Sequence, residues 1–307
     1  MNAALVWEAI RTFDLEEPAT PGHGRTADRW MSLFEVARRR TLSVARLVEA
    51  HVDALTILMA ASRPPGSGLY GVWASRGTLT FDGSVVSGVK PFCSGAGVVD
   101  RALVTAMDVG GEQVLLEVST RATSGLAFDW SSWSAVGMRD AQTATAAFDS
   151  HPVIGPPIGP KSGWYLGRDG FWHGAIGPAA CWAGGAAAVV DRAEDLVDGE
   201  PHRRAHLGAM RAGVISMTAL LIDAGRWADA DHRPREAVQA RALATRHVIE
   251  RTSSEIIDRF SRAFGPRPFL EDPSIEGRIA DLDMFRRQSH AERDLDALGR
   301  IPRDCLT

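Results

Sequence analysis

The stretch Leu79-Thr80-Phe81-Asp82-Gly83-Ser84-Val85-Val86 decides the fold class. The Asp82-Gly83 pair divides two apolar runs, which predicts a β-hairpin because Asp-Gly favours the tight turn between antiparallel strands. Downstream, short apolar runs rich in branched residues predict further strands. These strands are expected at 103–106, at 114–118 and at 144–148. The middle of the chain is therefore a block of strands and turns.

The residues on the N-terminal side of this block predict helices. From Ala3 to about Ala61 the pattern is helical, with a break expected at Pro18–Gly24. One face carries apolar residues at spacings of three and four, which is the helical period. Its members are Val44, Leu47, Val48, His51, Leu55 and Leu58.

The residues on the C-terminal side also predict helices, after a linker at Pro152–Pro160. The least charged stretch, Gly174–Val190, is expected to be a buried helix. Three more helices are expected at 204–227, at 236–260 and at 279–298, and Gly299 is placed as a stop signal for the last.

Strands that are segregated from helices along the chain predict an α+β protein rather than a doubly wound sheet. We expect N-terminal helices, a central β-barrel or sandwich-like domain and a C-terminal antiparallel helical bundle. The expected divisions are residues 1–62 for the N-terminal helical region, 63–158 for the β domain and 159–307 for the bundle.

The composition excludes several classes of protein. The chain has 307 residues, 45% of them hydrophobic, and a formal net charge of −4. This balance argues against nucleic-acid binding, which usually needs a basic excess. Gly174–Val190 is short and glycine-containing, so no membrane span is expected. No signal peptide is apparent after Met1.

The three cysteines, Cys93, Cys181 and Cys305, have no metal-ligand spacing, so no metal site is expected. Unpaired thiols are typical of a reducing compartment, which favours the cytoplasm.

Four segments then occur in an order that resembles one family. Ser62–Ser67 is similar to a Thr-Glu-Pro-x-Ala-Gly-Ser loop, one residue shorter and with Arg63 in place of Glu. Val86–Gly95 resembles a Leu-x-Gly-x-Lys-x-(Trp/Phe)-Ile-(Thr/Ser) strand. Gly137–Thr143 is similar to Gly-(Met/Leu)-Arg-x-Ser-x-Thr, and Arg204–Gly208 to Arg-x-x-Phe-Gly. Together they resemble the acyl-CoA dehydrogenase superfamily of flavoproteins, whose order is also helices, strands, helices.

The resemblance implies FAD as the cofactor and assigns four residues to it. Phe92 would pack on the isoalloxazine ring, and Ser94 would bond to the ring's polar edge, since the protein supplies position and electrostatics to a cofactor. Ser62 would also contact the flavin. Arg204 would pair with the diphosphate across a subunit interface, because an arginine fork suits phosphate oxygens. Without the family, Phe92 would be interpreted as a core residue of an alternating strand.

The resemblance also implies a substrate and partners. Gly66 and Ser67 would face an acyl thioester, and an electron-transfer or flavin reductase partner would exchange electrons with the flavin. The cofactor site would lie between subunits of a homodimer or homotetramer.

The catalytic base is where the chain departs from the family. The C-terminal stretch Phe285–Asp294 lacks Tyr-Glu-Gly-Thr, and Gly170 stands where another branch has Glu. The candidates are His290, Glu292 and Asp294, of which His290 and Asp294 are four apart and able to pair. A plain hydrophilic helix face is the alternative interpretation. The adenine-side motif Gln-x-x-Gly-Gly is also missing, with Ser261–Phe269 in its place.

Three functions follow as hypotheses. The first is an FAD-dependent α,β-dehydrogenation of an acyl thioester. The second is a two-component flavin-dependent monooxygenase, which shares the architecture and in some members carries Phe-x-Ser-Gly, as Phe92–Gly95 does here. The third is a flavin-free scaffold or interaction protein of the same fold.

Overall fold

The computed structural model describes residues 1–307 except 19, 122–123, 161, 169, 231–232 and 306–307. Its N-terminal part is helical: α1 spans Ala3–Thr12, α2 Thr26–Arg39 and α3 Leu42–Ala60. The break between α1 and α2 falls at the expected place. Thr41 begins α3, because its side-chain oxygen accepts a hydrogen bond from the Val44 N–H at 3.3 Å and satisfies a free helix donor.

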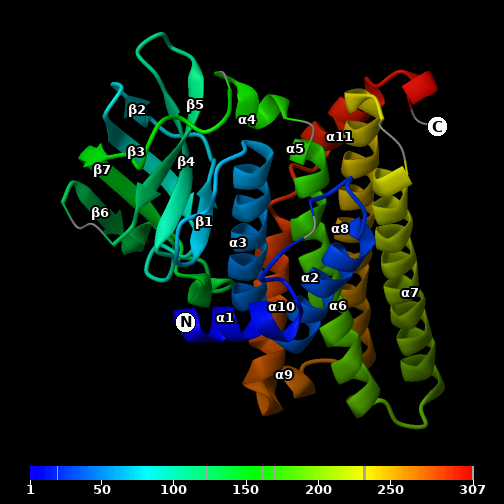
Figure 1. Cartoon of the computed structure of the whole chain (residues 1–307). Coiled ribbons are helices and arrows are strands. Elements are labelled where there is room, and N and C mark those ends of the chain that lie inside the picture. The colour runs from blue at the N-terminus through cyan, green and yellow to red at the C-terminus, as the bar shows by residue number, and fades with distance from the viewer. Residues whose placement is uncertain (19, 122–123, 161, 169, 231–232, 306–307) are drawn as a thin grey trace.

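The central part is one curled, mixed sheet of seven strands (Figure 1). The strands are β1 Tyr70–Trp73, β2 Thr80–Phe81, β3 Val85–Cys93, β4 Arg101–Met107, β5 Gln113–Ser119, β6 Leu126–Asp129 and β7 Ala144–Pro152. Their order is β1-β4-β2-β3-β7-β6, with β5 paired to β4. The expected hairpin is confirmed: β2 pairs antiparallel with β3 around Gly83, whose φ of 108° suits glycine.

The C-terminal part is again helical. Its helices are α4 Trp164–Gly167, α5 Gly170–Gly174, α6 Ile176–Leu196, α7 Pro201–Ala230, α8 Arg235–Phe264, α9 Arg267–Glu271, α10 Pro273–Arg286 and α11 Glu292–Gly299. The buried helix is confirmed as α6, and the two long helices as α7 and α8. The α+β class and its order of parts are confirmed as well. The domain divisions stay a prediction.

Two expected elements are corrected. A single helix over 279–298 is wrong: α10 ends at Arg286 and α11 begins at Glu292. Ala291 lies between them with a φ of 48° and a ψ of −119°, a positive-φ conformation that interrupts the helix. The expected linker is partly strand, since β7 runs to Pro152 and Ile158 bridges to Leu115 of β5.

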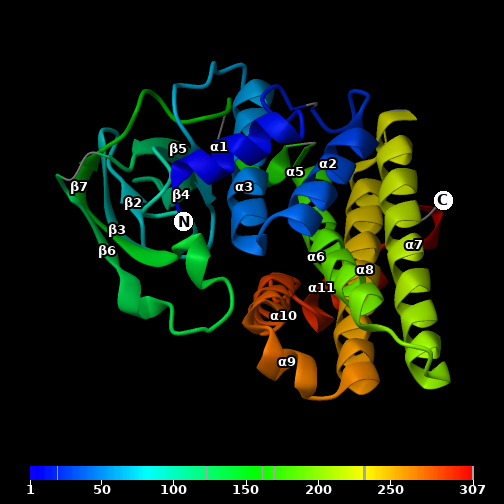
Figure 2. The same ribbon diagram turned by 90° about the horizontal axis from the view of Figure 1, so that it is seen from below.

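Helix α3 lies between the sheet and helices α2, α6, α7 and α8 in both views (Figures 1 and 2). It packs against β1 on one side and α6 on the other, while α2 packs on α6 and α7. The close α2–α6 contact requires Gly184, because a Cβ there would collide with the Phe34 carbonyl. The sheet and the helices therefore meet along α3.

Helix α7 lies at the outer edge of the molecule (Figure 1). Within the described ranges it is the one helix long and apolar enough to cross a membrane, and 22% of its apolar window is buried. One such helix is weak support for a membrane span. The apolar residues on its open side include Ile215, which is 68% exposed.

Candidate functional site

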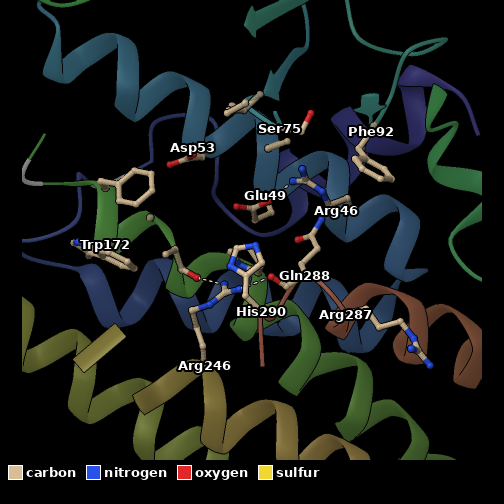
Figure 3. A pocket seen from close by; sticks show the side chains of 18 of the residues that line it. Arg46, Glu49, Asp53, Ser75, Phe92, Trp172, Arg246, Arg287, Gln288 and His290 are labelled. Carbon is tan, nitrogen blue, oxygen red and sulfur yellow. Dashed lines mark hydrogen bonds and ion pairs between the residues drawn. The ribbon is translucent and has the colours of Figure 1, made fainter. Parts of the chain in front are cut away.

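A cavity of about 680 Å³ lies where the sheet meets the helices. Its sheet side is formed by residues near the ends of β1 and β3, with Trp133 and Thr143 beside them. Its helical side comes mainly from α3, α5, α8 and the loop between α10 and α11, with single residues from α4, α6, α10 and α11. Figure 3 shows Ser75 and Phe92 on one side of this space, His290 and Arg246 on the other, and Glu49 and Arg46 between them.

Phe92 is held in an uncommon backbone conformation that exposes its ring to the cavity. The pairing of β3 with β7 shifts register between Lys90 and Cys93, and Phe92 has a φ of 59°. Bulges of this kind re-aim side chains, and positive φ at a bulky residue costs free energy. The Phe92 side chain is 64% exposed although it is aromatic. This strained, open ring is typical of a ligand-contacting position.

Ser94 lies beside Phe92 on the cavity wall. Its hydroxyl accepts a hydrogen bond from Thr143 Oγ1 at 3.3 Å, and its carbonyl accepts one from Trp73 Nε1 at 3.0 Å. These bonds leave the Ser94 hydroxyl hydrogen available to a ligand. The wall thus offers an apolar ring next to a polar edge.

Ser75 follows β1 and is tied to β3 by a buried lysine. Lys90 Nζ donates to the Ser75 carbonyl at 2.9 Å and to Thr105 Oγ1 at 2.8 Å. Burial lowers the pKa of Lys90 to about 8. The Ser75 hydroxyl donates to the Pro91 carbonyl at 2.5 Å. Lys90 therefore fixes both strand ends that form the sheet side of the cavity.

Helix α3 presents a charged stripe to the cavity. Arg46, Glu49 and Asp53 recur at helical spacing and all line it. Glu49 pairs with Arg46 at 2.5 Å, and its side chain is 6% exposed. Burial raises the pKa of Glu49 to about 7; Arg46 opposes that rise, and Asp53 adds to it. Sequence reasoning missed this stripe because it followed the apolar face of the same helix.

The C-terminal loop and the start of α11 supply a hydrogen-bonded histidine–aspartate pair. His290 Nδ1 lies 3.2 Å from Asp294 Oδ1, and the His290 N–H donates to Asp294 Oδ2 at 3.2 Å. The predicted pairing of His290 with Asp294 is confirmed. The two residues do not share a helix face as expected, because His290 precedes α11 and only Asp294 lies in it.

A buried arginine holds this loop in place. Arg246 of α8 donates to the Gln288 carbonyl at 2.9 Å and to the Ala175 carbonyl at 2.5 Å. Its guanidinium also lies 4.8 Å from the centre of the Trp182 ring, a cation–π contact. Burial lowers the pKa of Arg246. The arginine thereby anchors the residues that carry His290 to the start of α6.

The structure brings together four of the nine residues singled out from the sequence. Phe92, Ser94, His290 and Asp294 line the cavity. Glu292 is exposed on α11 and is not among the lining residues. Their roles toward a cofactor or substrate stay predictions.

The other predicted contacts lie elsewhere in this chain. Ser62, Gly66 and Ser67 are exposed on the loop before β1, outside the cavity lining. Arg63 of that loop pairs with the buried Glu117 at 3.0 Å, and Arg101 donates to the Ser67 carbonyl at 3.1 Å. Ion pairing thus accounts for the Arg in this loop.

Arg204 lies exposed at the start of α7, where its guanidinium donates to the Gly199 carbonyl. It does not line the cavity of its own chain. Its predicted role across a subunit interface stays a prediction.

Among the residues that the structure describes, no three His, Cys, Asp or Glu side chains gather as a possible metal site. Cys93, Cys181 and Cys305 are free thiols.

The fold is that of the acyl-CoA dehydrogenases. No family model matches the chain, and no curated protein matches it. Solved structures do. The dibenzothiophene monooxygenase TdsC from Paenibacillus sp. A11-2 is 16% identical, with a TM-score of 0.77 over 98% of this chain and 97% of that one.

Two further structures support the same fold. Butyryl-CoA dehydrogenase from Megasphaera elsdenii is 17% identical, with a TM-score of 0.72 over 89% of this chain and 80% of that one. KijD3, solved with FMN and a dTDP-linked amino sugar, is 19% identical, with a TM-score of 0.73 over 91% of this chain and 81% of that one. TdsC has also been solved with FMN and indole. TdsC and KijD3 have thus each been solved with FMN and a small molecule bound.

The cavity residues fit a flavin ring. A flavin offers a flat aromatic face and several hydrogen-bond acceptors at its edge. Phe92 supplies an apolar surface for that face. Arg46 and Trp172 also line the cavity, and they add a cation and a second flat aromatic surface to its walls.

Proposed function

We propose that this chain is a flavin-dependent monooxygenase of the two-component type, which receives reduced flavin from a separate reductase. The observation that carries the proposal is the His290–Asp294 pair at the cavity, across from the Phe92–Ser94 wall. The flavin would lie on that wall and the substrate between it and the helices. The FMN complexes of TdsC and KijD3 are consistent with this.

FMN is the form of flavin that we propose, in place of the FAD first implied by the family. The reason is that Ser261–Phe269 replaces the adenine-side motif. The cavity is lined with aromatic side chains, which favours a small aromatic or thioether substrate. Those side chains are Phe92, Trp133, Tyr165, Phe171 and Trp172.

Reduced flavin, when bound, supplies the electrons that activate molecular oxygen. The residues of the chain would do the rest. Phe92 and Ser94 would orient the ring, and the aromatic lining would exclude water. His290 would donate or accept the proton that accompanies oxygen transfer, with Asp294 fixing the ring's tautomer and orientation.

The test begins with visible absorption spectra of the purified protein before and after addition of FMN. Oxygen consumption is then measured with reduced FMN and with indole as the probe substrate. A perturbed flavin spectrum and substrate-dependent oxygenated product are expected. A flavin spectrum that the protein does not change would overturn the proposal. It would instead favour the hypothesis of a flavin-free scaffold protein.

Dehydrogenation of an acyl thioester is the second candidate. The specific observation in its favour is that α3 presents two carboxylates, Glu49 and Asp53, to the same cavity, since this chemistry needs a carboxylate base. Anaerobic mixing with acyl-CoA thioesters of several chain lengths should bleach bound flavin if this candidate holds. Bleaching would displace the monooxygenase proposal.

We also propose that the protein is a homo-oligomer whose subunits meet at the open face of α7, where Arg204 of one subunit could reach the flavin of another. Sedimentation velocity distinguishes this from a monomer.

A further inference from the structure

The carboxyl group of Glu49 belongs to a buried residue of α3 that also lines the cavity. Its side chain is 6% exposed and still lines the cavity. Gly177 makes room for it, because a Cβ at that position would lie 3.2 Å from Glu49 Oε1. The carboxyl therefore touches the cavity on one side and closely packed protein on the other.

Charged groups from several elements face this carboxyl. Arg46 forms the direct pair from the same helix, and Asp53 lies one turn further on. The other titratable or charged groups around it are Arg29 of α2, Tyr165 of α4, Arg168 after α4, Cys181 of α6, Arg246 of α8, and His290 with Asp294 across the cavity.

Arg46 is the direct partner of Glu49 and has nitrogen atoms to spare. Its NH1 binds Glu49, and its Nε is buried without a hydrogen-bond partner in the described structure. When Glu49 is protonated the guanidinium loses its anionic partner. It then keeps its full charge, with no carboxylate beside it, at the wall of the same cavity.

We propose that Glu49 is an acid–base residue that exchanges a proton with a weakly acidic O–H of the ligand, while Arg46 passes from Glu49 to the ligand anion. The O–H bond of the ligand breaks and its proton forms a bond to a Glu49 oxygen. The electron pair stays on the ligand atom, whose negative charge then pairs with Arg46. The net charge of the three groups does not change.

This exchange suits a buried site. Creating a new charge in a low-dielectric environment is costly, whereas moving one between adjacent groups is not. Because the pKa of Glu49 is about 7, the carboxyl can be either protonated or ionised near neutral pH. The ligand class that the site selects is therefore a phenol-like compound, whose O–H is acidic enough to give its proton to a carboxylate of this pKa. The use made of the ligand anion rests on the proposed flavin-dependent function, but the exchange itself does not.

The first experiment uses the flavin-free protein alone. Infrared difference spectra between about pH 6 and about pH 8 should show the carbonyl stretch of a protonated carboxyl that disappears as the pH rises. Glu49→Gln should lack this band, and Glu112→Gln, on the exposed β4–β5 turn, should keep it. Arg46→Met should move the midpoint of the band upward, which tests Glu49 without altering it. A band that is unchanged in Glu49→Gln and in Arg46→Met would overturn the proposal.

The second experiment measures the proton balance when 4-chlorophenol binds to the flavin-free protein at about pH 8, where this phenol is mostly neutral and Glu49, with a pKa of about 7, is mostly ionised. Calorimetry in two buffers of different ionisation heat reports the protons exchanged. At a pH where the free probe is neutral and Glu49 is ionised, the wild type should release close to no proton, because Glu49 keeps it. Glu49→Gln should release about one proton per bound probe, since Arg46 then binds the phenolate directly. Equal release by both proteins would contradict the exchange. Flavin binding is measured separately by visible absorption, so failure of either idea is recognised independently of the other.

Discussion

His290 Nδ1, in the break between α10 and α11, lies 3.2 Å from Oδ1 of Asp294 in the first turn of α11. The carboxylate also accepts the His290 N–H, so a single side chain fixes both the ring and the backbone that carries it. The side chain of His290 is 56% exposed and that of Asp294 is 16% exposed, so the aspartate is the more buried of the two.

Asp294→Asn should lower turnover of the proposed reaction by roughly 100-fold, because general acid–base groups contribute about 10²–10⁴-fold to a rate. Flavin affinity should stay the same. Steady-state oxygenation and a flavin titration on one preparation check both statements. Asp296→Asn, which removes an exposed partner of Arg300, is the matched control. A wild-type rate in Asp294→Asn would exclude the dyad from catalysis.

Phe92→Ala should weaken flavin binding by about tenfold, equivalent to about 1.4 kcal/mol, through loss of the apolar face. Fluorescence quenching of FMN measures the change. Val109→Ala removes an equally open apolar side chain on the β4–β5 turn, which is 88% exposed, and should leave affinity unchanged. The same affinity in both variants would remove Phe92 from the flavin site.

His51 should make the protein less stable in mild acid. Burial lowers the pKa of His51 to about 4 from 6.5, so the unfolded chain binds more protons between these values. Stability from this group is complete above about pH 6.5 and falls as the pH drops toward 4, by roughly 3 kcal/mol in all. Glu49 acts in the opposite sense, because its raised pKa makes stability fall as the pH rises from 4.5 to about 7.

The contribution of His51 is isolated by comparing wild type with His51→Gln, which keeps an acceptor for the Tyr70 N–H now bound at 3.1 Å. Urea unfolding at about pH 7 and about pH 5 gives the two free energies. The free energy of unfolding should fall less between pH 7 and pH 5 in His51→Gln than in the wild type. A parallel pH dependence in the two proteins would show that His51 does not titrate in this range.

Gly184→Ala should destabilise the protein by about 1–3 kcal/mol or more, because the new Cβ meets the Phe34 carbonyl where α2 packs on α6. Gly208→Ala is the control within α7: nothing lies within 4 Å of its Cβ position. There the substitution should be neutral or stabilising by up to about 1 kcal/mol. Thermal unfolding of both variants makes the comparison, and similar losses in the two would contradict the close-packing explanation.

The class of fold could be predicted from the sequence because its signals are local. The Asp82-Gly83 turn and the apolar period of α3 each appear in a short window. The break between α10 and α11 could not, since residues 287–291 contain neither glycine nor proline. Ala291 takes a positive φ there, which local propensity does not favour for a residue with a Cβ.

The site was predictable on one side only. Phe92 and Ser94 belong to a strand motif that resemblance could locate. Ser75 was missed because the similarity was placed on the loop from Ser62 to Ser67, which is held outside the cavity by Arg63 and Glu117. Glu49 was missed because charged residues within a helix usually face solvent, and only tertiary packing shows that this turn of α3 faces an enclosed space.

The cavity on α3 also has a mechanical consequence. Its walls belong to two bodies, the curled sheet and the helices, and a bound ligand touches both. Such a ligand stabilises the packing of the sheet against the helices, because it makes all its contacts only while the two remain packed together. At a free ligand concentration 100 times the Kd, it would add about 2.7 kcal/mol to the free energy of unfolding. The midpoint of thermal unfolding should therefore rise with the concentration of free ligand.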